Sequence, residues 1–146
     1  MMKVLVLVGV LVLLGLSCAT VSSNDSWTPL PEPGTISSVK IVPPGLDVLP
    51  QIAAYSGKWE GKWNNGRWVT IIIEKIEPPD VVAIYSWGLL GDTKGGWTRV
   101  LGQIEKDSVA LRWGGRTVIL TSTADKNTAN AEYRRVEVLY AVLRKN

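Results

Sequence analysis

The segment GKWEGKW, residues 57–63, has glycine or tryptophan at every odd position and a charged residue at every even position. Residues 108–113 and 128–134 show the same period, because apolar and polar side chains alternate along them. Successive side chains of a β-strand point to opposite faces, so this period predicts strands with one buried and one wet face. From residue 55 onward, no run of twelve or more residues has a helical period.

Turn signals divide residues 55–146 into short runs. The triplet NNG at 64–66 suits a primed hairpin turn, EPPD at 77–80 stops a strand, and GG at 114–115 marks another turn. We therefore expect eight strands at about 55–63, 68–76, 81–87, 96–105, 108–113, 116–122, 128–134 and 136–144.

The short connections favour an antiparallel meander, and an open meander would leave two exposed edge strands. Closure removes those edges. The sequence therefore predicts an all-β domain, an eight-stranded antiparallel up-and-down barrel over residues 53–146. The interior of such a barrel is filled by side chains or holds one small ligand.

The N-terminus has a different composition. Residues 1–17 contain one charge, Lys3, and an apolar run from Val4 to Leu16. This run is shorter than the ~20 residues of a bilayer-spanning helix. A positive start followed by a short apolar run is typical of an export signal, so we expect residues 1–17 to be a signal peptide.

Cys18, the only cysteine, follows this run in the segment LLGLSC. The segment resembles a bacterial lipobox, in which a small residue such as Ser17 precedes the acceptor cysteine. The resemblance implies that Cys18 becomes a lipidated N-terminus, and more than one acyl chain anchors a protein stably. Ala19, in place of the Asp that retains lipoproteins at the inner membrane, implies the outer membrane where the organism has one. We expect an exported, lipid-anchored protein of the cell envelope.

Residues 18–52 are rich in Ser, Thr and Pro and have no period. Such composition predicts a disordered tether, kept extended by its prolines. Without residues 1–17 the chain has 15 basic and 13 acidic residues. This near balance, in an exported protein, argues against a nucleic-acid partner.

Gly57-Lys58-Trp59 begins the first expected strand. A Gly-x-Trp at that place in an eight-stranded meander resembles the calycins, the lipocalin and avidin superfamily. There the indole lies across the closed end of the barrel and a basic residue of the last strand stacks on it. The resemblance implies that Gly57, Trp59 and Arg144 close the barrel, with a cation–π contact between the last two. We expect Gly57 and Gly61 to leave space for the Trp59 ring.

Five of the seven tryptophans fall at the opposite end, where odd strands end and even strands begin. We call this end the mouth; its tryptophans are Trp63, Trp68, Trp87, Trp97 and Trp113. Basic residues fall near it as well, namely Arg67, Lys94, Arg116, Arg134 and Arg135. The turns of the other end carry acidic residues instead, namely Glu77, Asp80, Glu105, Asp107 and Asp125.

The aromatic, basic mouth has more than one interpretation. Concave aromatic surface with a few polar groups is typical of ligand pockets. The five tryptophans would then bind a small amphiphilic or hydroxylated ligand, with Arg116 and Arg135 orienting an anionic or hydroxylated group. Alternatively the tryptophans fill the barrel, and the rim of a structural or interaction lipoprotein contacts an envelope protein. The glycine-flanked loop at 88–96 suggests a lid over the mouth.

Catalytic motifs are missing from the sequence. The chain has no histidine, which excludes a Ser-His-Asp triad, a Cys-His pair and histidine metal sites. The segment GLLGDTKGG at 88–96 lacks the spacing of a phosphate-binding loop. We therefore expect neither an enzyme nor a metal or other cofactor.

Overall fold

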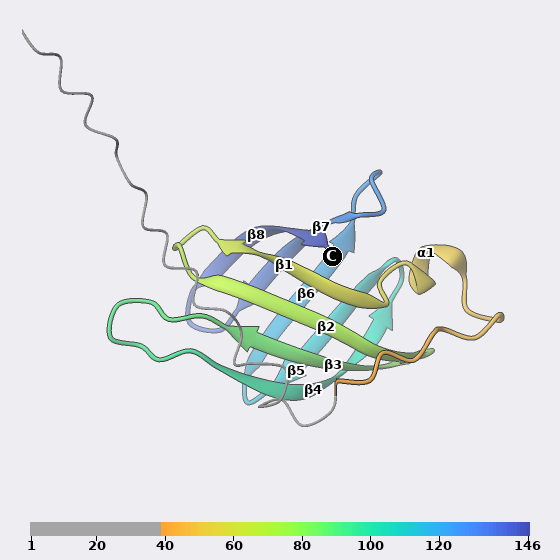
Figure 1. Ribbon diagram of the computed structural model, residues 1–146, viewed down its shortest axis with the longest axis horizontal. Helices are drawn as coiled ribbons and strands as arrows, with labels where there is room; N and C mark the ends of the chain where they lie inside the picture. The colour runs from red at the N-terminus through yellow and green to blue at the C-terminus, as the bar shows by residue number, and fades with distance from the viewer. Residues whose placement is uncertain (1–38) are drawn as a thin grey trace, which may run out of the picture.

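The computed structural model describes residues 39–146, and its eight strands form one closed barrel in which each strand pairs with its sequence neighbours (Figure 1). All pairings are antiparallel, including that of the first strand with the last, which confirms the predicted up-and-down barrel. The strands are β1 (Gly57–Trp63), β2 (Trp68–Glu77), β3 (Asp80–Trp87), β4 (Gly96–Glu105), β5 (Ser108–Trp113), β6 (Arg116–Ser122), β7 (Thr128–Arg134) and β8 (Val138–Lys145). The predicted signal peptide and Cys18 lie outside the described residues.

The barrel closes where β1 meets β8. Gly61 is paired with Leu143 of β8, and a Cβ at Gly61 would lie 2.5 Å from the carbonyl oxygen of Val142. Gly57 has a φ of +116°, and a Cβ there would meet the Lys145 side chain at 3.1 Å. The expectation that these glycines make room for the Trp59 ring is therefore wrong. They are required because β8 approaches β1 closely and because φ at Gly57 is positive.

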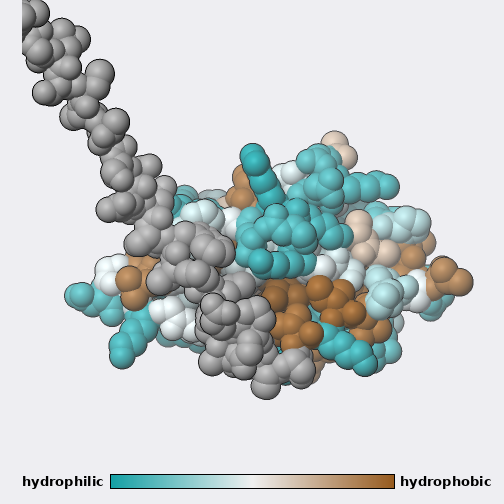
Figure 2. Space-filling view, viewed as in Figure 1, coloured by the Kyte–Doolittle hydropathy of each residue, from teal (hydrophilic) through white to brown (hydrophobic). Residues whose placement is uncertain are grey.

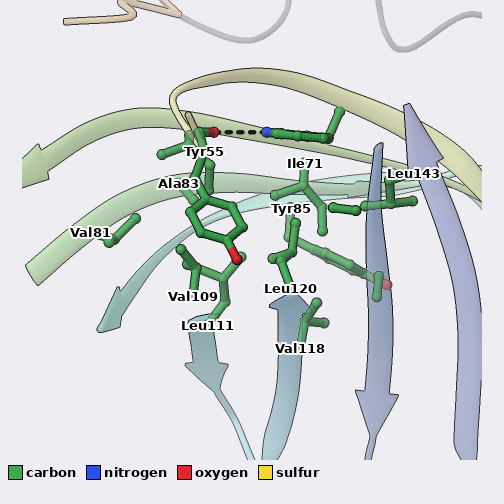
Figure 3. Packing of buried hydrophobic residues seen from close by; sticks show 14 of the residues in the cluster. Tyr55, Ile71, Val81, Ala83, Tyr85, Val109, Leu111, Val118, Leu120 and Leu143 are labelled. Atoms are coloured by element: carbon green, nitrogen blue, oxygen red, sulfur yellow. Dashed lines mark hydrogen bonds between the residues drawn. The ribbon is translucent and has the colours of Figure 1, made fainter. Parts of the chain in front are cut away.

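The end of the barrel opposite the mouth is filled by aromatic side chains. Trp59 is 1% exposed, and its Nε1 donates a hydrogen bond to the carbonyl oxygen of Tyr55 at 2.8 Å (Figure 3, dashed line). The Tyr55 hydroxyl donates to the Asp107 carbonyl at 2.6 Å and accepts from the Ser122 N–H at 2.7 Å. Tyr55 therefore joins the start of the barrel to the β4–β5 turn and to the end of β6. We call this end the closed end.

Arg144 does not contact Trp59, so that prediction is wrong. Its place is taken by Lys145, whose Nζ lies 5.5 Å from the centroid of the Trp59 ring. Trp59 is paired with Lys145 across β1 and β8, whereas Arg144 is paired with Glu60. Paired residues share a face of the sheet, and a shift of one residue moves a side chain to the other face. Lys145 therefore points inward and Arg144 outward.

The described part of the predicted tether packs on the barrel. Val42 donates its N–H to the carbonyl oxygen of Glu74 in β2 at 2.7 Å. A short helix, α1 (Pro50–Ala53), follows, and Val48 and Ile52 are buried in the core of the barrel. Burial of these apolar side chains offsets the conformational entropy that is lost when the segment becomes ordered, although its overall composition is typical of a tether. No helix within residues 39–146 is long and apolar enough to span a bilayer.

The core consists of the inward residues of all eight strands. Figure 3 shows residues of β3, β5 and β6, among them Val81, Leu111 and Leu120, converging inside the barrel. β2 is buried on both faces, because Ile71 and Ile73 point inward while Ile72 packs with Ile84 and Trp97 in a second cluster outside. Figure 2 shows a hydrophobic area below a hydrophilic one on the viewed face. The barrel thus has one large interior cluster and a small external one.

Candidate functional site

The mouth opens into a pocket of about 840 Å³. The connections around it, which include residues 88–95, lie at the left in Figure 1, away from α1. Five aromatic residues line the pocket: Trp63, Tyr85, Trp87, Trp113 and Tyr133. Four basic residues line it as well: Arg67, Lys94, Arg116 and Arg135. The volume is within the range of about 300–1,000 Å³ that is usual for small-molecule sites.

Three of the five predicted tryptophans and both predicted arginines line this pocket. Trp63, Trp87 and Trp113 end β1, β3 and β5, and each points to the barrel interior. Odd strands of an up-and-down barrel end on one side, which is why residues far apart in the sequence meet here. Arg116 begins β6, and Arg135 lies in the β7–β8 turn.

Trp68 lies on the outer face of the barrel, so it is removed from the predicted site. The cause is the length of the β1–β2 hairpin loop. Trp63 donates its N–H to the carbonyl oxygen of Arg67, which leaves a three-residue loop and pairs Trp68 with Lys62. A primed two-residue turn would instead have paired Trp63 with Trp68 on the inner face. The loop places Arg67 inside and Trp68 outside, where Lys62 Nζ lies 4.9 Å from the indole centroid.

Trp97 is also outside. It is paired with Ser86 of β3 and packs on Ile72 and Ile84. Gly96, one residue earlier, is paired with Trp87 and lies on the inner face of the barrel. A Cβ on Gly96 would lie 2.8 Å from Cζ2 of Trp87. The absence of a side chain at Gly96 therefore lets the Trp87 indole lie flat on the wall of the pocket.

Tyr85 is the centre of the aromatic cluster, and the sequence interpretation missed it. Its ring centroid lies 4.7 Å from that of Trp113, 5.8 Å from Trp87 and 6.4 Å from Tyr133. Trp63 and Tyr133 are 5.9 Å apart. Tyr85 lies two residues before Trp87 on the same face of β3, and this alternation is the sequence signal for its position. The tilted and stacked arrangement of these rings stabilises the cluster beyond its buried area.

Burial raises the pKa of Tyr85 to about 12, and the nearby Trp63 indole N–H, Arg67 and Arg116 only partly oppose this. The hydroxyl therefore stays protonated near neutral pH and can donate a hydrogen bond. The Trp63 indole N–H lies near enough to this hydroxyl to lower its pKa as a hydrogen-bond donor does, yet Trp63 Nε1 meets no acceptor in full hydrogen-bond geometry.

Two buried N–H donors in the pocket have no hydrogen-bond acceptor among the described residues. They are Nε1 of Trp63 and Nε of Arg67. The Trp63 side chain is 2% exposed. Most buried donors in proteins are satisfied, so both stand out as places where a ligand acceptor fits.

The loop at 88–95 takes part in the site. Leu90 and Thr93 exchange two backbone hydrogen bonds, of 3.1 and 3.0 Å, and both residues line the pocket. Trp87 Nε1 donates to the carbonyl oxygen of Lys94 at 3.3 Å, which ties the loop to the aromatic cluster. The loop thus forms one side of the opening.

No family model, curated protein or solved structure matches this chain. Within residues 39–146, no group of three or more His, Cys, Asp or Glu side chains is arranged to hold a metal ion.

Proposed function

We propose that this protein binds a small amphiphilic or hydroxylated molecule, without catalysis, in the pocket at the mouth of its barrel. The observation that carries the proposal is the pocket of about 840 Å³ lined by five aromatic rings. A barrel with a fully packed interior would have favoured the alternative, an interaction protein. Aromatic walls with a few polar groups are typical of small-molecule sites.

The resemblance to the calycins supports the same proposal. The Gly57-Lys58-Trp59 motif belongs to an eight-stranded barrel with Trp59 at the closed end. Eight-stranded barrels of lipocalins and of streptavidin, an avidin-type protein, can hold one small ligand. In this chain, Trp87 and Trp113 would provide apolar area, and Arg116 and Arg135 would orient a polar group.

Calorimetric titration of the full-length chain with fatty acids, lysophospholipids and short glycans tests the proposal. We expect saturable binding of one of these classes. Trp87→Ala and Trp113→Ala should each weaken binding about tenfold or more, as loss of a central aromatic contact does. Trp68→Ala is the matched control, because Trp68 lies at the same end but outside the barrel. Absence of binding by every class, with a cooperative unfolding transition, would refute the proposal.

We also propose that the protein is lipidated at Cys18 and anchored to the cell envelope. The LLGLSC segment supports this proposal, as does the apolar run that precedes it. Incorporation of labelled palmitate in a bacterial host is the measurement. The wild-type chain should carry label in the membrane fraction, and Cys18→Ala should carry none. Label on the Cys18→Ala variant would contradict the assignment.

A second candidate function is contact of the rim with an envelope protein. Leu89 and Val136, in two connections at the mouth, are 56% and 96% exposed. Exposed apolar side chains at a rim favour a protein contact. Photo-crosslinking from position 136 in intact envelopes tests this candidate. A discrete adduct together with no small-molecule binding would favour it, and no adduct would remove it.

A further inference from the structure

Two buried polar groups of the pocket are donors without acceptors among the described residues. Trp63 Nε1 and Arg67 Nε are both buried and donate to no hydrogen-bond acceptor among residues 39–146. Trp63 and Arg67 face each other across the β1–β2 hairpin, joined by the Trp63 N–H to Arg67 carbonyl hydrogen bond of 2.9 Å. A buried N–H that lacks an acceptor is costly to keep. A ligand with a hydrogen-bond acceptor at the inner wall of the pocket would therefore satisfy these two N–H groups.

The charge of the pocket selects the kind of acceptor. Arg67, Lys94, Arg116 and Arg135 line it, and Glu137 is the one acidic residue among the lining residues. Guanidinium groups bind carboxylates and phosphates through charge-assisted hydrogen bonds. Five aromatic rings alone would also suit a quaternary ammonium group. The excess of positive charge opposes a cation and favours an anion.

The burial of the lining residues sets the orientation of the ligand. Trp63 is 2% exposed, whereas Trp87 and Trp113 are only partly buried. The two donor atoms are thus shielded from solvent, while the rings of Trp87 and Trp113 are partly exposed. The Tyr85 hydroxyl, protonated at neutral pH, adds a further donor beside Trp63.

We propose that the pocket takes a single-chain amphiphile with an oxyanion head, a carboxylate or a phosphate, that accepts hydrogen bonds from Trp63 Nε1 and Arg67. Its apolar body lies against the rings of Trp87 and Trp113 toward the opening. This inference rests on the proposed ligand-binding function. It goes further, because it assigns the charge of the head group and the direction in which the ligand enters.

Four amphiphiles with the same alkyl chain and different heads test the inference: dodecanoate, dodecyl phosphate, dodecanol and dodecyltrimethylammonium. Each is titrated into the full-length chain by calorimetry, below the concentration at which micelles form. We expect at least one anion to bind about tenfold or more tighter than the alcohol and the ammonium compound, as hydrogen bonds to charged groups do. The ratio between dodecanoate and dodecyl phosphate tells which oxyanion the pocket prefers.

The outcomes separate the inference from the proposed function. Equal affinity for all four heads, or preference for the alcohol or the ammonium compound, would overturn the inference and leave a binding protein. Binding of none of them, nor of any glycan, would overturn both.

Two variants locate the anion. Arg67→Gln should weaken the preferred anion about tenfold and leave dodecanol unchanged. Trp63→Phe keeps an aromatic ring and removes the indole N–H, so it should weaken the same anion about fivefold. Arg144→Gln is the matched control, since it removes the same charge from the outer face. A loss shared by Arg144→Gln, or affinity unchanged in both pocket variants when they unfold as cooperatively as wild type, would overturn the assignment.

Discussion

Lys145 Nζ lies 5.5 Å from the ring centroid of Trp59 and donates a hydrogen bond of 2.7 Å to the carbonyl oxygen of Ala54. The last strand is thereby joined both to the first strand and to the segment that precedes it. Burial also lowers the pKa of Lys145. The contact closes the barrel at the end away from the mouth.

Replacement of Lys145 by Met should therefore destabilise the barrel. We expect a loss of about 1–2 kcal/mol in the free energy of unfolding, from the cation–π contact and one hydrogen bond. Urea denaturation measures it. Arg144→Met, the neighbouring change on the outer face, should stay within about 0.5 kcal/mol of wild type. A larger loss of stability in Arg144→Met than in Lys145→Met would instead indicate that Arg144 is the partner of Trp59.

Tyr55→Phe removes a hydroxyl that bridges two backbone groups. The Asp107 carbonyl and the Ser122 N–H each lose their hydrogen bond to this side chain. We expect a loss of about 2 kcal/mol, because a polar group is left without its partner in a partly buried site. Thermal unfolding measures the change. Tyr140→Phe, at a tyrosine that is 57% exposed, serves as the control and should be nearly neutral. Equal stability of the two variants would contradict the bridging role.

Alkaline pH should destabilise the protein through Tyr85. Its pKa is about 12 in the folded state and 10.0 in the unfolded chain, so the unfolded state releases the proton first as pH rises. The stabilising effect is complete below pH 10 and is lost as pH rises toward 12. A difference of this size corresponds to about 3 kcal/mol, at 1.36 kcal/mol per unit. Urea denaturation across this range, compared with Tyr85→Phe, measures the effect. A parallel decline in both proteins would contradict it.

Gly96→Ala should disturb the pocket without opening the barrel. The added Cβ would lie 2.8 Å from Cζ2 of Trp87, so the indole must move. We expect a loss of about 1–3 kcal/mol in stability, as overpacking causes, and a changed near-ultraviolet circular dichroism spectrum. Ligand affinity should fall as well, because Trp87 forms part of the pocket wall. An unchanged spectrum and affinity would show that the wall does not depend on Gly96.

The strands and their closure were predictable, because alternation and turn residues act locally and a short meander has few ways to hide its edges. The same alternation predicts that Trp63, Trp87 and Trp113 point to the interior of the barrel. Trp68 was misplaced because one extra loop residue reverses the facing of a whole strand, and NNG is compatible with loops of two lengths. Arg144 is predicted in place of Lys145 for a similar reason, because a shift of one residue along β8 moves a side chain to the other face of the sheet.

Other features depend on three-dimensional contacts that the sequence does not express. Val48 and Ile52 lie in a proline-rich segment whose average composition hides two apolar anchors. The hydroxyl of Tyr55 meets partners 52 and 67 residues away. The unsatisfied donors of Trp63 and Arg67 are defined by what surrounds them and not by residue type. These contacts join residues that are far apart in the sequence, so they become visible only when the strands pack together in the barrel.

Tyr55, which precedes the first strand, ties the closed end of the barrel to a turn and to a strand far along the chain. The rim of the opening, by contrast, carries exposed side chains such as Leu89 and Val136, which are not part of the buried core. Substitutions there can alter what is recognised while the architecture persists. The buried contacts of the closed end leave little freedom for substitution, whereas exposed positions on the rim can be varied to change the shape and charge of the opening.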